Sequence, residues 1–335
     1  MKPSPLSVLV VHEAFGADAR PDEIDALVQV EQVSEAIRKL GWRVNSLPVD
    51  LNLDAALAGI REHVPSCVFN LVESLGGDGR MIHFLPALLG TAGIPFTGAD
   101  ADAIYRSSQK LLAKELMRSH GIATPDSFTG QDVPVDSTAT WIVKSVWEHA
   151  SFGMDDGCVV NGSDKARRRI AESETMYGGE WFAEKFVDGR EFNISVMEHD
   201  GQPYILPIAE MTFVDYPKGK PRIVGYAAKW DENAPEYRAT CRVFPSLDES
   251  ERSRLLDIVQ QCWRSFGLRG YARIDVRLDA NGNPWVLEIN ANPCLSRDAG
   301  FAAAALQAGM SFEKLIERIV RAALRPALLA FRRAG

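Results

Sequence analysis

Residues 271–293 read YARIDVRLDANGNPWVLEINANP and contain two strand-like runs. Tyr271–Leu278 and Pro284–Ile289 are rich in apolar and β-branched residues, and they flank the polar segment Asp279–Asn283. The dipeptide Asn-Gly within that segment favours a two-residue turn of type I′. The sequence therefore predicts an antiparallel hairpin.

This turn fixes which side chains of the hairpin face one another. With Asn-Gly at its centre, Asp275 faces Glu288 and Arg273 faces Asn290. Because side chains alternate between the two faces of a strand, all four share one face. Directly opposed carboxylates repel each other unless a positive charge lies near them. A divalent cation such as Mg²⁺, shared between carboxylates and substrate phosphates, fits this arrangement, and an Arg–Asp–Glu surface network is the alternative.

The N-terminal third of the chain alternates between strands and helices. Leu6–Val11 is a continuous apolar run, which is typical of a strand buried on both faces. From Asp22 to Leu40, apolar residues recur every three or four positions, which predicts a helix. This alternation predicts a parallel α/β layer, and we assign residues 1–105 to a first domain. The pattern continues with strands at Trp42–Val49 and Cys67–Val72 and a helix at Asp54–His63.

The rest of the chain predicts two further domains. Trp181–Val187 and Glu191–Met197 resemble strands joined by a tight turn at Asp188-Gly189. We assign residues 106–195 to a small α+β domain and residues 196–335 to a C-terminal domain that contains the hairpin. Other predicted elements are a strand at Trp141–Val146 and helices at Ser107–His120, Lys165–Glu174, Asp248–Phe266 and Ser311–Leu324.

Composition limits the classes of function. The 335 residues are 46% hydrophobic and 24% charged, which is ordinary for a globular protein. The net charge of −8 argues against a broad nucleic-acid surface, which needs a basic excess. The five cysteines form no close pair, so we expect reduced thiols. No segment has the length of a membrane span. We expect a cytoplasmic protein without nucleic-acid or membrane partners, and a homodimer is an open alternative.

The hairpin also carries a family resemblance. RIDV at Arg273–Val276 followed by LEINANP at Leu287–Pro293 resembles the metal-binding end of ATP-grasp ligases, above all the D-alanine–D-alanine ligase group. The resemblance continues through QAGMSF at Gln307–Phe312, and GIPFTG at Gly93–Gly98 is similar to the end of the family's first domain. It implies an α/β ATP-grasp fold with an N-terminal Rossmann-like domain. The implied cofactors are ATP and Mg²⁺, with Mn²⁺ as an alternative metal.

The resemblance also implies roles for individual residues. Lys110 and Lys144 fall on lysines that contact ATP phosphates, and an ATP tail needs several such cations. Glu148 and Ser151 fall in a mobile loop that covers the phosphates and excludes water. Lys229 matches a lid lysine near the γ-phosphate. The other implied roles are an adenine-binding strand at Glu184, Lys185, Phe186 and Val187, a ribose-binding carboxylate at Glu191, and metal ligands at Asp275, Glu288 and Asn290.

Together these roles imply a carboxylate–amine ligase that acts on small-molecule substrates, namely amino acids or peptides. A substrate carboxylate attacks the γ-phosphate of ATP, which yields ADP and an acyl phosphate, and an amine then displaces phosphate to form an amide. Arg273 is expected to stabilise the oxyanion of the second step, and Lys229 and Ser151 are the other candidate catalytic residues. Two alternatives stay open: an ATP-dependent small-molecule kinase, and a non-catalytic nucleotide-binding module of the same fold.

The chain departs from the family where substrates are expected to bind. After Glu148 it has His149 and Ala150 in place of glycine, and Cys294 also replaces a glycine. Ala299-Gly300 replaces the family's serine–leucine pair, which helps to hold the carboxylate of the second amino acid.

The changed pair at 299–300 predicts a roomier acceptor end that grips a free carboxylate less well. We therefore expect D-alanine to be a poor second substrate or not the only one, unless Ser296 or Arg297 takes over the missing contact. The glutamate expected to bind the first amino group has no clear match, and the candidates are Glu13, Asp22, Glu23 and Asp25.

Overall fold

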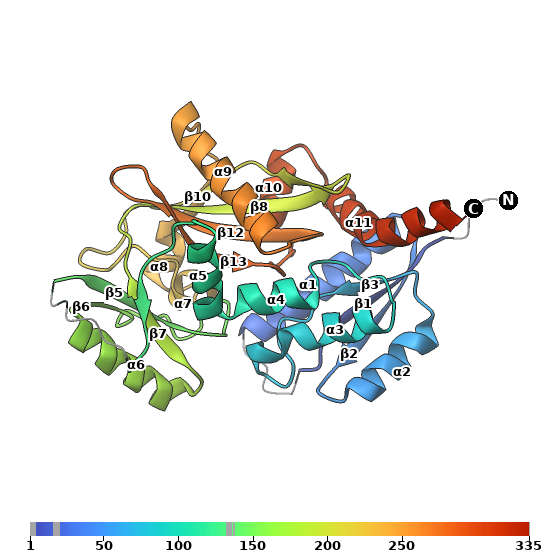
Figure 1. The fold of residues 1–335 in the computed structure, drawn as a ribbon, viewed down its shortest axis with the longest axis horizontal. Coiled ribbons are helices and arrows are strands. Elements are labelled where there is room, and N and C mark those ends of the chain that lie inside the picture. Colours follow the sequence, from blue (N-terminus) through green and yellow to red (C-terminus); the bar gives the residue numbers. More distant parts are fainter. Residues whose placement is uncertain (1–4, 16–20, 132–135, 137, 335) are drawn as a thin grey trace.

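The chain folds into three β-sheets with helices packed around them (Figure 1). In this view the sheets of β1–β3 and of β4–β7 lie on opposite sides, below the largest sheet. The computed structural model describes residues 5–15, 21–131, 136 and 138–334, with side chains except at 21–23 and 326–334.

The N-terminal sheet has three parallel strands in the order β2-β1-β3. Its central strand β1 (Ser7–Glu13) is buried from Val8 onward, as a strand covered on both faces must be. The predicted parallel α/β layer is therefore confirmed. The other elements are α1 (Pro21–Lys39), β2 (Arg43–Val49), α2 (Leu53–His63), β3 (Cys67–Asn70), the 3-10 helix η1 (Gly79–His83) and α3 (Phe84–Thr91).

The second sheet is antiparallel, in the order β4-β7-β5-β6. The single helix predicted at Ser107–His120 is wrong, because Gln109 is extended and separates two helices. Lys110 thus becomes the first residue of the second helix, and its N–H donates to the carbonyl of Val146 at 3.1 Å. The elements are α4 (Ala101–Ser108), α5 (Lys110–Ser119), β4 (Ser127–Phe128), β5 (Thr140–Ser145), β6 (Val159–Asn161), α6 (Ser163–Tyr177) and β7 (Trp181–Lys185).

β7 and β8 (Arg190–His199) do not form the hairpin predicted from Asp188-Gly189. β7 pairs with β4 and β5, whereas β8 pairs with β9, β10 and β12 of another sheet. A Cβ atom on Gly189 would lie 1.9 Å from the carbonyl oxygen of Leu278, so this close approach requires the glycine. The domain limits at 105 and 195 stay predictions, and the change of sheet lies between β7 and β8.

The third sheet has the order β11-β10-β8-β12-β13, with β9 also paired to β8. One face of β8 and β12 packs on α9 in a core that includes Phe192, Ile274 and Leu255. This core holds the central strands rigidly beneath the face that carries the charged side chains. The elements are β9 (Gln202–Ile205), β10 (Ala209–Phe213), α7 (Tyr226–Trp230), α8 (Pro235–Ala239), β11 (Thr240–Val243), α9 (Glu249–Ser265), β12 (Tyr271–Leu278), β13 (Pro284–Asn290), α10 (Gly300–Gln307) and α11 (Phe312–Ala334).

The register of β12 and β13 agrees with the sequence prediction at its charged end. Asp275 is the Cα partner of Glu288, and Arg273 is the partner of Asn290. On the opposite face Ile289 is fully buried in the core. The predicted charged face is therefore confirmed.

The turn that joins these strands is longer than predicted. The N–H of Asp279 donates to the carbonyl of Asn283 at 3.0 Å, so three residues connect the strands, and Gly282 adopts φ 74°. This turn shifts the pairing by one residue, and a bulge between Asp275 and Val276 shifts it back. The type I′ turn was wrong, and the bulge explains why the register was nonetheless right.

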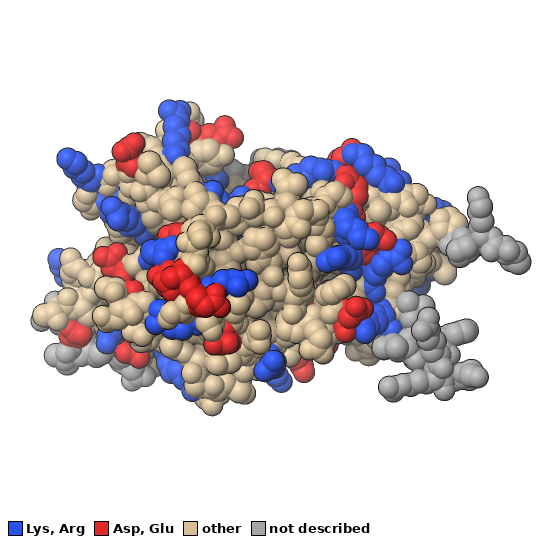
Figure 2. Space-filling model, turned by 90° about the horizontal axis from the view of Figure 1, so that it is seen from above, with Lys and Arg blue, Asp and Glu red and all other residues tan. Residues whose placement is uncertain are grey.

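Acidic and basic side chains lie interspersed on the face seen from above in Figure 2. All five cysteines are free thiols. Among the helices that the structure describes, none is long and apolar enough to cross a membrane.

Candidate active site

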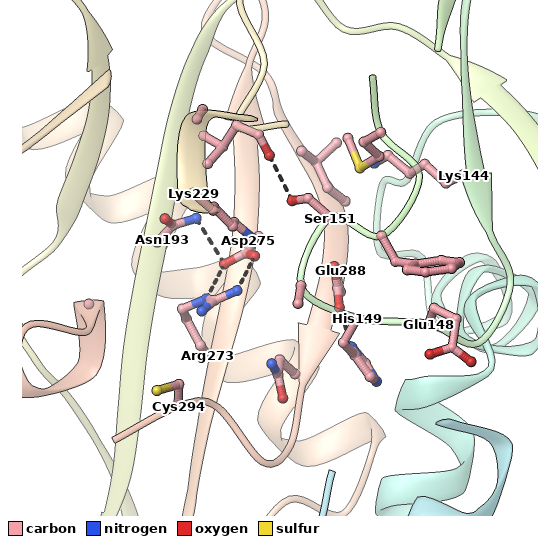
Figure 3. Close-up of a pocket in the computed structure, with 18 of the residues that line it drawn as sticks. Lys144, Glu148, His149, Ser151, Asn193, Lys229, Arg273, Asp275, Glu288 and Cys294 are labelled. Atoms are coloured by element: carbon pink, nitrogen blue, oxygen red, sulfur yellow. Dashed lines mark hydrogen bonds and ion pairs between the residues drawn. The ribbon is translucent and has the colours of Figure 1, made fainter. Parts of the chain in front are cut away.

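A cavity of about 600 Å³ lies between the three sheets and is lined by elements of each. Figure 3 shows Lys144, Glu148 and Ser151 on one side of it, facing Arg273 and Asp275 on the other. Every residue to which the resemblance gave a role lines this cavity. The structure thus brings them together, and their individual roles stay predictions.

Asp275 is held in place by two neighbours on β12 and β8. Arg273 donates Nε to Oδ1 and Nη2 to Oδ2, both at 2.8 Å, and Asn193 donates to Oδ1 at 3.0 Å (Figure 3). Burial lowers the pKa of Arg273, but the charge of Asp275 outweighs it and the pKa is raised. Lys229 lies close by, and burial followed by the charge of Arg273 lowers its pKa. Asp275 therefore has a fixed orientation within a basic environment.

Glu288 is tied to the loop that follows β5. Its Oε1 lies 2.9 Å from Nδ1 of His149. Burial raises the pKa of Glu288, but Lys110 and the His149 hydrogen bond bring it well below its usual value. An ionised carboxylate only accepts, so Nδ1 carries the donated proton. Lys110 donates to the carbonyl of Glu148 at 2.7 Å, which links the same loop to the start of α5.

Another buried carboxylate, Glu184, lies between two lysines. Lys144 Nζ is 2.6 Å from Oε1 and Lys114 Nζ is 2.5 Å from Oε2. Burial raises the pKa of Glu184, but the two lysines outweigh it and lower the pKa. Burial lowers the pKa of Lys144, but the charge of Glu184 outweighs burial, so the pKa of Lys144 is raised. At Lys114 burial outweighs the charge of Glu184, so the pKa of Lys114 is lowered. Lys144 therefore keeps its charge at the cavity wall.

Glu191 and the end of β7 are organised by Arg277. Arg277 donates Nε and Nη2 to Oε2 of Glu191, at 3.0 and 2.7 Å, and Nη1 to the carbonyl of Val187 at 2.7 Å. Its guanidinium also lies 4.9 Å from the ring centroid of Phe186. One arginine therefore fixes three predicted nucleotide-binding residues relative to one another.

The loop after β5 folds over the cavity. Oε1 of Glu148 accepts a hydrogen bond from the N–H of Gly79 at 3.2 Å, and the Ser151 hydroxyl donates to the carbonyl of Val224 at 2.8 Å. Ala150 and Ser151 have φ of 58° and 62°, which non-glycine residues seldom adopt. The loop is thus anchored to the N-terminal region on one side and to the segment before α7 on the other.

Asp275, Glu288 and Asn290 offer oxygen donors from two opposed strands. This donor set fits Mg²⁺, which takes a few carboxylate or amide oxygens and shares its other positions with water and phosphate. In the described part of the chain, no cluster of three or more His, Cys, Asp or Glu side chains is placed to hold a metal unaided.

The first-amino-group candidates differ in their surroundings. Glu13 accepts hydrogen bonds from the Ser74 hydroxyl and, at 3.1 Å, from the N–H of Gly77. Asp25 lines the cavity beside the Cys294 thiol at 3.5 Å, and burial raises its pKa. The side chains of Asp22 and Glu23 lie outside the described residues.

A family model described as “D-ala D-ala ligase C-terminus” matches residues 129–321, which is more than half of the chain. The chain belongs to this family. Membership places it among the ATP-dependent ligases that form carbon–nitrogen bonds, and the resemblance seen in the sequence is confirmed.

Relatives and solved structures extend the likeness beyond the C-terminal part. An uncharacterized protein of Sinorhizobium fredii, y4sG, is 32% identical over 262 residues, which is 77% of this chain and 74% of that protein. A D-alanine–D-alanine ligase of Pseudomonas fluorescens is 29% identical over 92% of this chain and 90% of its own. The D-alanine–D-alanine ligase of Bacillus anthracis complexed with ATP is 19% identical, with a TM-score of 0.73 over 96% of this chain and 98% of its own. This structural likeness confirms the predicted α/β ATP-grasp fold.

Sequence reasoning missed several residues that support the site in this family member. Arg277 could have been found, because it continues the alternation of Arg273 and Asp275 on one face of β12. Lys114 lies on α5 one turn after Lys110, but nothing in the sequence shows that it meets Glu184. Nothing in the sequence indicated that Arg242, on β11, lines the cavity either.

Proposed function

We propose that this protein is an ATP- and Mg²⁺-dependent carboxylate–amine ligase that works through an acyl phosphate and whose acceptor is not restricted to D-alanine. The observation that carries the proposal is the convergence of four cationic side chains and two opposed carboxylates on one cavity. The cations are Lys110, Lys144, Lys229 and Arg273, and the carboxylates are Asp275 and Glu288.

The nucleotide is assigned to the part of the cavity between the second and third sheets. Residues 184–187 line that part, and the backbone after β7 is available to read the edge of a base. Glu191 has Oε2 bonded to Arg277, so a ribose hydroxyl would meet Oε1. Lys110 and Lys144 then meet the phosphates, where lysine acts as a point charge.

Asp275, Glu288 and Asn290 would hold the metal, for which Mg²⁺ is proposed and Mn²⁺ is the alternative. When bound, it would offset negative charge on the phosphates. The ionised state of Glu288 and the fixed orientation of Asp275 support this assignment.

In the first step, an oxygen of the substrate carboxylate forms a bond to the γ-phosphorus while the bond to the β–γ bridging oxygen breaks and ADP leaves. In the second step, the acceptor nitrogen bonds to the acyl carbon and loses a proton, and the carbon–oxygen bond to phosphate breaks. Arg273 lines the cavity beside Asp275, and its positive charge would stabilise the oxyanion of this second step. The loop that carries Glu148 and Ser151 excludes water from the acyl phosphate.

The proposed change of acceptor rests on Ala299 and Gly300, which line the cavity. Ala299 lacks the hydroxyl of the family's serine, and Gly300 lacks the apolar side chain of the family's leucine. The sequence predicted only more room at the acceptor end of the cavity, but the side chain of Arg242 occupies part of the space beside Gly300. We expect amino acids other than D-alanine to be turned over at least as well.

The test is phosphate release from ATP and Mg²⁺ with panels of D- and L-amino acids and dipeptides, alone and in pairs. The proposal predicts inorganic phosphate together with a product that contains both amino-acid units. A phosphorylated single substrate without inorganic phosphate would instead indicate a kinase. Efficient turnover of D-alanine, with none of any other amino acid or dipeptide, would contradict the altered specificity and leave the ligase assignment intact.

A further inference from the structure

Arg242 lies on the edge strand β11, and its guanidinium lies against the first residue of α10. A Cβ atom on Gly300 would be 3.5 Å from Nε and 3.8 Å from Cζ of Arg242. Nη1 donates to the carbonyl of Asp298 at 3.1 Å, which holds the guanidinium at this corner. A longer side chain at position 300 would therefore compete with Arg242 for the same space.

The guanidinium faces the cavity without a carboxylate of its own. Within the part of the chain that the structure describes, its hydrogen-bond acceptor is the Asp298 carbonyl, and it forms no ion pair. Burial lowers the pKa of Arg242, Arg273 lowers it further, and the charge of Asp298 opposes both to a smaller extent. Two arginines on one cavity wall favour an anion between or beside them.

Two other residues are candidates to replace the family's serine, but neither brings a positive charge to the cavity. Arg297 forms ion pairs with Glu313 at 3.2 Å and Glu35 at 3.6 Å, and it is not among the described residues that line the cavity. Ser296 lines the cavity, but it is neutral and almost fully buried, and its hydroxyl accepts from the Cys294 thiol at 3.3 Å. Of these three residues, Arg242 is therefore the one that brings a positive charge to the acceptor corner.

We propose that Arg242 binds the carboxylate of the acceptor amino acid, at the corner where Ala299-Gly300 replaces the family's serine–leucine pair. The guanidinium offers a planar pair of donors that matches a carboxylate, and Gly300 leaves the room for it. This inference rests on the ligase function proposed above and adds the residue that reads the acceptor.

A competition experiment tests it. The best amino acid of the panel is mixed with an equal concentration of its carboxamide, which lacks a carboxylate and can act only as acceptor. The ratio of the two ligation products, measured by mass spectrometry, gives the preference for a charged acceptor. The wild type should strongly favour the free acid, and Arg242→Met should reduce this preference by roughly 10-fold or more, since a charged hydrogen bond is lost.

Two further variants sharpen the result. Arg242→Lys keeps the charge and should retain part of the preference. Arg238→Met removes an exposed arginine of α8 that does not line the cavity, and its ratio should equal that of the wild type. Because Arg242 is itself exposed, its variants are expected to fold. Ligation by Arg242→Met with an unchanged product ratio would overturn this inference alone, whereas no amino-acid-dependent phosphate release by the wild type would overturn the ligase function as well.

Discussion

Asp275 lies directly opposite Glu288 across the β12–β13 pair, and each carboxylate has its own donor: Arg273 for Asp275 and His149 for Glu288. Without these donors the opposed charges would repel each other. The two donors differ in kind, because Arg273 belongs to the same rigid strand whereas His149 belongs to a loop. A cation that binds between the carboxylates would therefore replace the loop contact more readily than the strand contact.

Glu288→Gln should reduce Mg²⁺-dependent turnover by roughly 100-fold or more, because a neutral amide binds a hard cation and offsets charge far less well. Its stability should change by less than about 1 kcal/mol, since the amide oxygen can still accept from His149. Turnover as a function of Mg²⁺ concentration, together with thermal unfolding, checks both. Exposed Glu232→Gln is the matched control, and normal turnover by Glu288→Gln would remove this residue from the metal site.

Lys144 and Lys114 contact the same carboxylate, but we expect substitution of Lys144 to weaken nucleotide binding and substitution of Lys114 to lower stability. Lys144 lines the cavity, so Lys144→Ala should raise the Kd for ATP by roughly 10-fold or more. Lys114 is 1% exposed and does not line the cavity, so Lys114→Met should mainly lower the free energy of unfolding, by about 3 kcal/mol. Calorimetry with ATP and chemical denaturation measure the two effects. The assignment fails if the two variants lose ATP affinity equally.

The pH at which activity falls on the alkaline side should lie below the pKa of an ordinary exposed lysine. Burial lowers the pKa of Lys229 and of Lys110, so both lose their charge at a lower pH than an exposed lysine does. If the charged forms bind phosphate, kcat/KM for ATP, which reports the free enzyme, must fall as the pH rises through these lowered values. Lys229→Arg keeps its charge and should move this limit to higher pH. If kcat/KM falls at the same alkaline pH in the wild type and in Lys229→Arg, Lys229 is not the group whose titration causes the fall.

His149→Ala should loosen the loop that covers the cavity. The substitution removes the hydrogen bond to Glu288, while Ala150 and Ser151 retain their strained backbone. Limited proteolysis without nucleotide should therefore cut this loop faster than in the wild type. His120→Ala, at the exposed end of α5, serves as the control. Equal cleavage of wild type and His149→Ala would show that the contact does not hold the loop.

The sequence predicted those parts of the fold that depend on local pattern. The buried first strand followed from its continuous apolar run, and the charged face of β12 followed from the period of two. The hairpin register was right although the turn was wrong, because the bulge beside Asp275 compensates for the longer turn. A bulge leaves little trace in a single sequence.

What the sequence could not show depends on contacts between distant segments. Asp188-Gly189 has the composition of a turn, yet its glycine is required by the backbone of Leu278, about ninety residues away along the chain. Lys114 and Arg242 look like surface residues of a helix and a strand until the sheets are brought together. Resemblance located the predicted site residues but could not reveal the arginine beside Gly300.

Isotope transfer from the donor carboxylate to phosphate tests whether the reaction passes through an acyl phosphate. The donor amino acid, labelled with ¹⁸O in its carboxylate, is turned over with ATP, Mg²⁺ and an acceptor, and the released phosphate is analysed by mass spectrometry. An acyl phosphate requires one labelled oxygen in each phosphate, because the carboxylate oxygen that attacks the γ-phosphorus leaves with it. Unlabelled phosphate would exclude an acyl phosphate, since ATP would then have been cleaved without activating the carboxylate.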